Sequence, residues 1–160
     1  MRVGNCGYGM ELILLIGIPG AGKSTFYYRR FFNTHVRINL DMLKTRRREL
    51  LLVQACIAAR QPFVVDNTNV LASERARYIT LARPAGFHIV GYYFQPNLTQ
   101  ALEHNRQRSG KARIPAGGVV GRLRRLEPPD LAEGFDRLYS VRIVPGKGEF
   151  VVEEYVKRET

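Results

Sequence analysis

Short runs of apolar residues recur along the chain and alternate with longer amphipathic stretches. Runs of this length are typical of buried strands, which we expect at 12–17, 36–38, 63–66, 87–94, 139–144 and 150–156. The amphipathic stretches predict helices at 23–32, 41–60, 72–82, 98–106 and 119–126. Because strands that alternate with helices build βαβ units, the pattern predicts an α/β fold with a mainly parallel sheet flanked by helices on both faces.

Turn-forming and capping residues mark the ends of these elements. Residues 1–10 are rich in glycine and show no periodicity, so we expect a flexible leader followed by one domain at 11–160. Residues 109–118 are basic and contain glycine, which indicates a loop or lid. The candidate N-caps of the expected helices are Asp41, Asn69 or Ser73, and Asn97.

Apolar runs and cysteines bear on where the protein resides. The longest apolar run is far shorter than the ~18 residues of a membrane span, and it lacks the basic flank of a signal peptide. Cys6, Cys56 and three scattered histidines provide neither a disulfide framework nor metal-ligand spacing. We therefore expect a cytoplasmic protein with free thiols, no membrane partner and no structural metal.

Positive charge is concentrated in two segments. The chain has 25 lysines and arginines against 14 acids, which gives a net charge of +11. Residues 29–48 and 104–125 together hold fourteen of these cations and a single acid, Asp41. A localised basic excess indicates a polyanionic partner, most simply nucleic acid; a solvated face that keeps the protein soluble would give the same pattern.

A phosphate-binding motif follows the first expected strand. Residues 17–24, GIPGAGKS, match G-x-x-x-x-G-K-[ST] between an apolar strand and a helix. The glycines let backbone N–H groups surround phosphate oxygens, Lys23 reaches the β- and γ-phosphates, and the Ser24 hydroxyl binds Mg²⁺. The sequence therefore predicts a site for ATP or another nucleoside triphosphate with Mg²⁺. The residues that form it are Gly20, Ala21, Gly22, Lys23, Ser24 and Thr25.

Two aspartates follow strands whose carboxyl ends should meet at this loop. Asp41 is suited to accept a proton from an acceptor hydroxyl, and it is also suited to cap the next helix. Asp66 ends the FVVD strand, where a ligand of Mg²⁺ or water, or a turn-forming residue, is expected. Cations after helix 98–106 either stabilise a transferred phosphoryl group from a lid or contact a phosphate backbone or solvent. They are Arg106, Arg108, Lys111 and Arg113.

Three stretches, in order, resemble the kinase module of polynucleotide 5′-hydroxyl kinases within the P-loop kinase superfamily. They are GIPGAGKST at 17–25, INLD at 38–41, and DNTN at 66–69 followed by ASERARYITLARPAG. The resemblance continues through LEHNRQR, IP and LAEGFD, and it covers residues 11–144. It implies a P-loop kinase fold with an Arg-bearing lid, and transfer of the γ-phosphate of ATP to a 5′-OH end of DNA or RNA.

The resemblance also implies roles for the matching residues. Asp41 would be the general base, Lys23 and Arg108 would be catalytic cations, and Arg106 and Arg108 would contact ATP. Ser24 and Asp66 would hold Mg²⁺. This chain departs from relatives in having lysine where some carry an acceptor-binding arginine, and His104-Asn105 where many read Arg-Asn. The implied acceptor-binding residues are Lys44, Arg46, Arg47, Arg48, Asn67 and Thr68.

Two other functions remain compatible with these residues. One is a P-loop kinase of a small metabolite or nucleoside, which would not need the two basic segments. The other is a non-catalytic, NTP-dependent module that binds nucleic acid, which would not need Lys23, Ser24 and Asp41 together.

Overall fold

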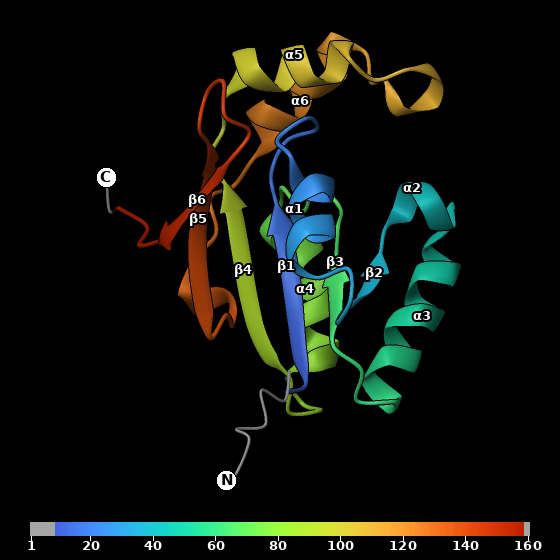
Figure 1. The fold of residues 1–160 in the computed structure, drawn as a ribbon. Coiled ribbons are helices and arrows are strands. Elements are labelled where there is room, and N and C mark those ends of the chain that lie inside the picture. The colour runs from blue at the N-terminus through green and yellow to red at the C-terminus, as the bar shows by residue number, and fades with distance from the viewer. Residues whose placement is uncertain (1–8, 159–160) are drawn as a thin grey trace, which may run out of the picture.

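A six-stranded sheet with helices on both faces forms the centre of the computed structural model, which describes residues 9–158 (Figure 1). Across the sheet the strands follow the order β2-β3-β1-β4-β5-β6, and every neighbouring pair is parallel except β5 with β6. The predicted α/β fold with a mainly parallel sheet is thereby confirmed. The strands are β1 (Glu11–Ile16), β2 (Val36–Ile38), β3 (Phe63–Val65), β4 (His88–Phe94), β5 (Arg137–Ile143) and β6 (Phe150–Glu154).

Six α-helices and two short 3₁₀ turns connect the strands. Within residues 9–158, no helix combines the length and the apolar character needed to cross a membrane. Most of the leader expected at 1–10, and Cys6 with it, lies outside the described residues. The helices are α1 (Lys23–Arg30), α2 (Leu40–Leu43), α3 (Arg46–Ala58), α4 (Ala72–Ala82), α5 (Leu98–Arg106) and α6 (Ala116–Arg125); the 3₁₀ turns are η1 (Gly110–Ala112) and η2 (Leu131–Glu133).

The central strand β1 is buried on both faces, as its unbroken apolar run predicts. Ile13 and Leu15 point into a core formed with the aromatic residues of α1. Leu12 and Leu14 point to the opposite face, where α3 and α4 supply the core. These two layers bring the carboxyl ends of β1, β2, β3 and β4 to one edge of the sheet, with α5 and α6 above it (Figure 1).

The prediction of a single helix at 41–60 is wrong, because the chain forms two helices there. Lys44 takes a positive φ of 74°, and Thr45 is extended. The Thr45 side chain accepts a hydrogen bond from the Arg48 N–H and so starts α3 afresh. The apolar periodicity runs through this break, so it did not reveal the new start.

Two of the expected helix starts also differ from the structure. Asn39 caps α2 by accepting from the Met42 N–H, which leaves Asp41 in the first turn rather than at the cap. Leu71 precedes α4, and the Glu74 carboxylate accepts from its N–H, so neither Asn69 nor Ser73 is the cap. The third expectation is confirmed, because Asn97 accepts from the Gln100 N–H at the start of α5.

The lid expected at 109–118 has more helix than its sequence suggested. It contains η1, and α6 begins at Ala116 rather than at 119. Asn105 closes the intervening loop, since its amide donates to the Ile114 carbonyl and accepts from the Ile114 N–H. A small apolar cluster around Ile18, Ala101 and Val119 packs α5 and α6 over the loop that follows β1.

Candidate functional site

A cavity of about 370 Å³ opens at the carboxyl ends of the parallel strands, between the loop after β1 and the lid. Its walls come from several separate parts of the chain. Nine of the residues that the sequence nominated line this cavity. Its polar lining includes Lys23, Ser24, Asn39, Asp41, Arg46, Asp66, Asn67, Thr68, Asn69, Glu74, Arg108 and Arg122.

The phosphate loop depends on glycine at two positions. Gly20 and Gly22 have φ values of 82° and 96°, a region that side chains disfavour. A Cβ atom at Gly20 would also collide with the Ala101 carbonyl oxygen of α5. The loop therefore sits tightly under the lid and aims the N-terminus of α1 at the cavity, as a phosphate site requires.

Lys23 is the most perturbed cation of the cavity. Its ammonium group donates to the Gly17 and Ile18 carbonyls at 2.9 Å each, and only 8% of the residue is exposed. Burial lowers the pKa of Lys23 to about 8, the Asp66 charge opposes the shift, and Arg108 adds to it. The side chain is held at the loop, where a phosphate would complete its hydrogen bonds.

Ser24 and Asp66 form the oxygen pair expected of a magnesium site. The Ser24 hydroxyl donates to Asp66 Oδ2 at 2.9 Å. Hydroxyl and carboxylate oxygens suit Mg²⁺, so the two residues fit the ion. Arg37, which the sequence did not single out, shares the site: its Nε donates to Asp66 Oδ2 at 2.8 Å and its Nη2 to Ser24 Oγ at 3.1 Å. The guanidinium balances the buried carboxylate.

The loop after β3 holds the turn that carries Asp41. Asn39 Nδ2 donates to the Asp66 carbonyl at 2.6 Å, and the Leu40 N–H donates to Asn67 Oδ1 at 2.9 Å. These bonds fix the first turn of α2 at the cavity wall, which the exposed Asp41 lines together with Lys23 and Ser24. Such a carboxylate can receive a proton from a hydroxyl bound in the cavity.

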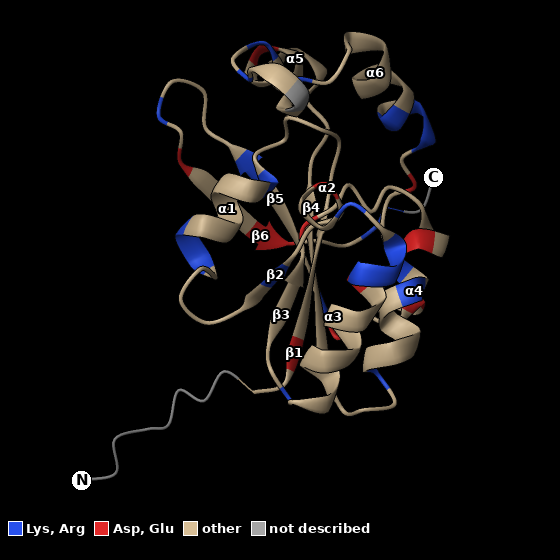
Figure 2. Ribbon diagram, turned by 90° about the vertical axis from the view of Figure 1, so that its right-hand side faces the viewer, with Lys and Arg blue, Asp and Glu red and all other residues tan. Residues whose placement is uncertain are grey.

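Cations from both basic segments reach the cavity. Arg46 comes from the first segment, and Arg108 and Arg122 come from the second. Arg122 was not among the nominated site residues, yet its charge, like that of Arg108, lowers the pKa of Lys23. Figure 2 shows further Lys and Arg on the same side of the molecule, along α6 and beside α3 and α4.

Six other nominated residues do not line the cavity. Arg106 is exposed and pairs with Glu103 at 3.0 Å on the outer surface of α5. Thr25 is exposed on α1, and Lys44 forms the break between α2 and α3. Arg47 and Arg48 are exposed at the start of α3, beside Arg46. Ala21 is partly buried and packs against the apolar cluster beneath the lid.

A buried polar network between α3, α4 and the loop after β3 supports the cavity. Glu49 accepts from Arg46 at 2.8 Å, from the Tyr78 hydroxyl at 2.9 Å and from Asn67 Nδ2 at 3.0 Å. Asn67, nominated as an acceptor-binding residue, therefore has both ends of its side chain bonded within the protein. Thr68 lines the cavity, and its carbonyl accepts from the Gly17 N–H, which ties this loop to the phosphate loop.

A second network joins the sequence stretches DNTN, RARY and LAEGF. Arg75 is fully buried and pairs with both oxygens of Glu133, at 2.7 and 3.0 Å. Its Nη1 donates to the carbonyls of Asn69 and Val70. Arg75 is thus a positioning residue that fixes the loop after Asp66.

Replacing Glu133 with glutamine should destabilise the protein by about 3 kcal/mol, because it leaves the buried Arg75 charge without its carboxylate. The measurement is the free energy of unfolding from urea denaturation. Glu103→Gln is the matched control; it breaks an exposed pair and should change that free energy by less than about 1 kcal/mol. Equal effects of the two substitutions would contradict a structural role for the Arg75 pair.

A phosphate loop at the end of β1, helices on both faces of a mainly parallel sheet and a lid above the loop define the P-loop kinase fold, a class of phosphotransferases. The chain belongs to the AAA domain family, whose pattern matches residues 12–129.

Individual proteins agree with this placement. The bifunctional polynucleotide phosphatase/kinase of Schizosaccharomyces pombe is 25% identical over 140 residues, which cover 82% of this chain and 33% of that protein. This chain therefore spans about a third of the length of that curated relative. The resemblance to polynucleotide kinases seen in the sequence is confirmed.

Two solved structures share the fold. A chain in the structure of the Pnkp1/Rnl/Hen1 RNA repair complex superposes with a TM-score of 0.62 and 22% identity over 77% of this chain and 46% of that chain. A gluconokinase from Sinorhizobium meliloti 1021 superposes with a TM-score of 0.56 and 21% identity, covering 82% of each chain.

Proposed function

We propose that this protein is an ATP-dependent polynucleotide 5′-hydroxyl kinase. The observation that carries the proposal is the composition of one cavity. It contains a buried phosphate-loop lysine, a carboxylate on α2 and cations from both basic segments. A neutral small acceptor has no need of Arg46, Arg108 and Arg122 around it, whereas a nucleic-acid end brings phosphates that they can neutralise. The S. pombe relative, named as a polynucleotide phosphatase/kinase, supports the same acceptor class.

In the proposed reaction, Asp41 accepts the proton of the 5′-hydroxyl as its oxygen attacks the γ-phosphorus in line. The bond from the γ-phosphorus to the β,γ-bridging oxygen breaks, and ADP leaves with that electron pair. Lys23 and Arg108 stabilise the charge on the transferred group and on the leaving oxygen. Ser24 and Asp66 would hold Mg²⁺, which supplies further charge neutralisation at the phosphates when bound.

The test compares acceptors and salt concentrations. Labelled phosphate from ATP should pass to a 5′-OH oligonucleotide much faster than to a free nucleoside or gluconate. Oligonucleotide affinity should fall with salt, by a log–log slope of roughly 0.7 for each phosphate contact to a single strand. Arg47→Gln/Arg48→Gln should weaken binding and flatten the slope without changing ATP affinity, because both arginines are exposed beside the cavity.

Arg137→Gln is the control, since it removes an exposed cation at the amino end of β5, away from the cavity. Equal transfer to a nucleoside and to an oligonucleotide would refute the proposal in favour of a small-acceptor kinase. An oligonucleotide affinity that does not change with salt concentration would do the same. Oligonucleotide binding without any transfer would favour a non-catalytic module.

The pKa of Lys23 makes ATP binding depend on pH. Because that pKa is about 8, the lysine loses its proton above this pH, while phosphates favour the ammonium form. ATP binding should therefore take up a proton at about pH 9 but not at about pH 7, and affinity should fall as the pH rises through this range. Calorimetry in buffers of different ionisation enthalpy measures the uptake. Lys23→Arg, which stays charged, should abolish it.

The lowered pKa of Lys23 also makes the free energy of unfolding depend on pH, in a defined direction. Between about pH 8 and 10.5 the folded chain has lost the Lys23 proton and the unfolded chain has kept it. The unfolded state then binds more protons, so the contribution of Lys23 to the free energy of unfolding rises with pH across this window.

A further inference from the structure

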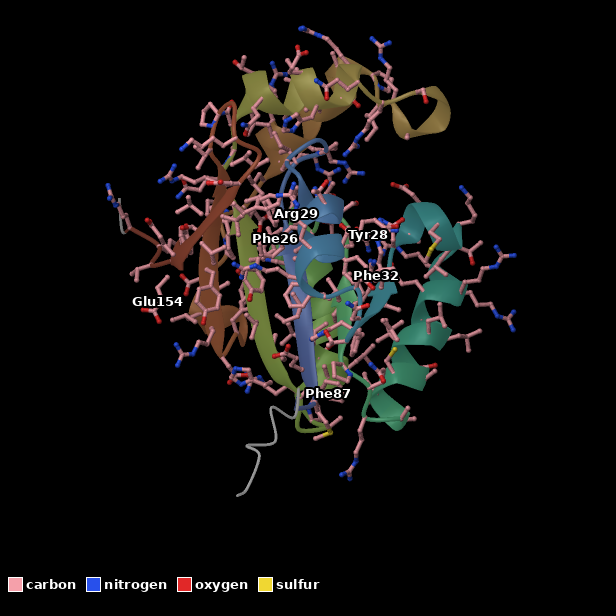
Figure 3. The ribbon with its side chains drawn as sticks, in the orientation of Figure 1. Phe26, Tyr28, Arg29, Phe32, Phe87 and Glu154 are labelled. Carbon is pink, nitrogen blue, oxygen red and sulfur yellow. The ribbon has the colours of Figure 1, made fainter. Side chains whose placement is uncertain are left out.

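Two exposed aromatic rings lie on and just after α1, the helix that follows the phosphate loop, and have no part in the proposed chemistry. Tyr28 on α1 and Phe32 in the turn after it are 57% and 60% exposed. Their ring centroids are 5.6 Å apart and their planes differ by 31°, so the two rings present one nearly continuous surface. Figure 3 shows both on the side of α1 that faces α2, whereas Arg29 lies on the other side.

Arg37 connects this aromatic pair to the reacting end of the cavity. Its guanidinium carbon lies 6.0 Å from the Tyr28 ring centroid, within the range of a cation–π contact. The same guanidinium donates to Ser24 and Asp66, the proposed magnesium residues. The aromatic surface is thus continuous with the site through one side chain.

The charge next to the pair suits an anion. Arg37 contacts the Tyr28 ring, and residues 23–37 contain no acid. Asp41 belongs to α2, the helix that faces the aromatic pair, and the proposed reaction places the 5′-hydroxyl at its carboxylate. We expect the nucleotides that follow this hydroxyl to leave the cavity on the side of α1 that faces α2, where Figure 3 shows the two rings.

We infer that Tyr28 and Phe32 form a stacking platform for unpaired bases next to the 5′ end of the acceptor strand. Exposed aromatic faces bind successive bases of a single strand without regard to sequence, because every base has a π-face. The inference rests on the proposed function for its occupant, and it adds a preference for ends whose first bases are unpaired. A blunt duplex keeps its bases stacked on one another and cannot use the platform.

The chain has no tryptophan, so a single introduced tryptophan reports contact directly. In Phe32→Trp, titration with a short oligothymidylate or oligouridylate should quench the tryptophan emission along the binding curve. Leu131→Trp is the control. Leu131 is 51% exposed on η2, before the amino end of β5, and its emission should not respond. Unchanged emission of Phe32→Trp at saturating oligonucleotide would overturn the inference.

Affinity gives the second readout. Tyr28→Ala/Phe32→Ala should weaken single-strand binding by about tenfold or more, while ATP affinity and the thermal unfolding midpoint stay unchanged. Tyr28→Phe should bind like wild type, because the ring is kept, and so should Leu131→Ala. Wild-type affinity in the double variant would overturn the platform.

These binding assays separate the two proposals because they need no phosphoryl transfer. If wild type binds oligonucleotides through the platform but transfers no phosphate to them, the kinase assignment fails and the platform stands. If transfer proceeds and the double variant binds normally, only the platform fails. If wild type binds no oligonucleotide, both fail.

Discussion

Asp41→Asn should lower phosphoryl transfer to a 5′-OH oligonucleotide by about 10²–10⁴-fold, the usual cost of losing a general base. Asparagine keeps the shape of the side chain but cannot take up the proton of the attacking hydroxyl. The turn that carries residue 41 should survive, because Asn39 caps α2 and Asn67 holds the Leu40 N–H. Single-turnover transfer of labelled phosphate measures the loss.

ATP binding provides the control for this substitution. Asp41 has no hydrogen bond to the phosphate loop among the described residues, so the dissociation constant for ATP should change little. Asn39→Ala tests the alternative that transfer depends only on the conformation of the turn. This substitution removes the observed cap of α2 and leaves the Asp41 carboxylate in place. If Asp41→Asn lost ATP affinity together with transfer, residue 41 would be a nucleotide or structural residue and not the base.

Lys23→Ala should reduce the transfer rate by at least about 10²–10³-fold, the effect of removing one preorganised charge from a transition state. The ammonium is buried at the phosphate loop, where water does not screen it and no other described lysine lines the cavity. ATP affinity should fall as well, because the same charge meets the phosphates in the ground state. Transfer and equilibrium binding of ATP measure the two effects.

Lys157→Ala is the matched control for Lys23→Ala. Lys157 is an exposed lysine after β6 that pairs with Asp130 and does not line the cavity, so transfer should stay near the wild-type rate. Wild-type turnover by Lys23→Ala would contradict the assignment of the nucleotide site to this loop.

The sequence alone placed those elements whose conformation depends on residues close to them in the chain. The alternating apolar runs placed the strands because a parallel strand must bury both faces. The G-x-x-x-x-G-K-S spacing placed the phosphate loop because only glycine accepts the positive φ at positions 20 and 22. Asn97 was found as a cap because its partner is three residues away.

The break between α2 and α3 had a local cause but only a weak signal in the sequence. Threonine is a preferred N-cap, but the apolar positions on either side of Thr45 continue one helical pattern. Only the backbone conformation of Lys44 and the bond from Arg48 to Thr45 show that a new helix begins. The break sets the direction of the turn that carries Asp41, so this detail matters to the site.

The charges around the reacting centre were decided by the tertiary structure alone. Arg37 reaches Asp66 across 29 positions of sequence, and Arg75 reaches Glu133 across 58. The sequence identified basic segments by counting, but it could not show that Arg122 faces the cavity while Arg106 pairs outward with Glu103. An ion pair depends on a few ångströms between side chains, and that distance is set by how helices pack on the sheet.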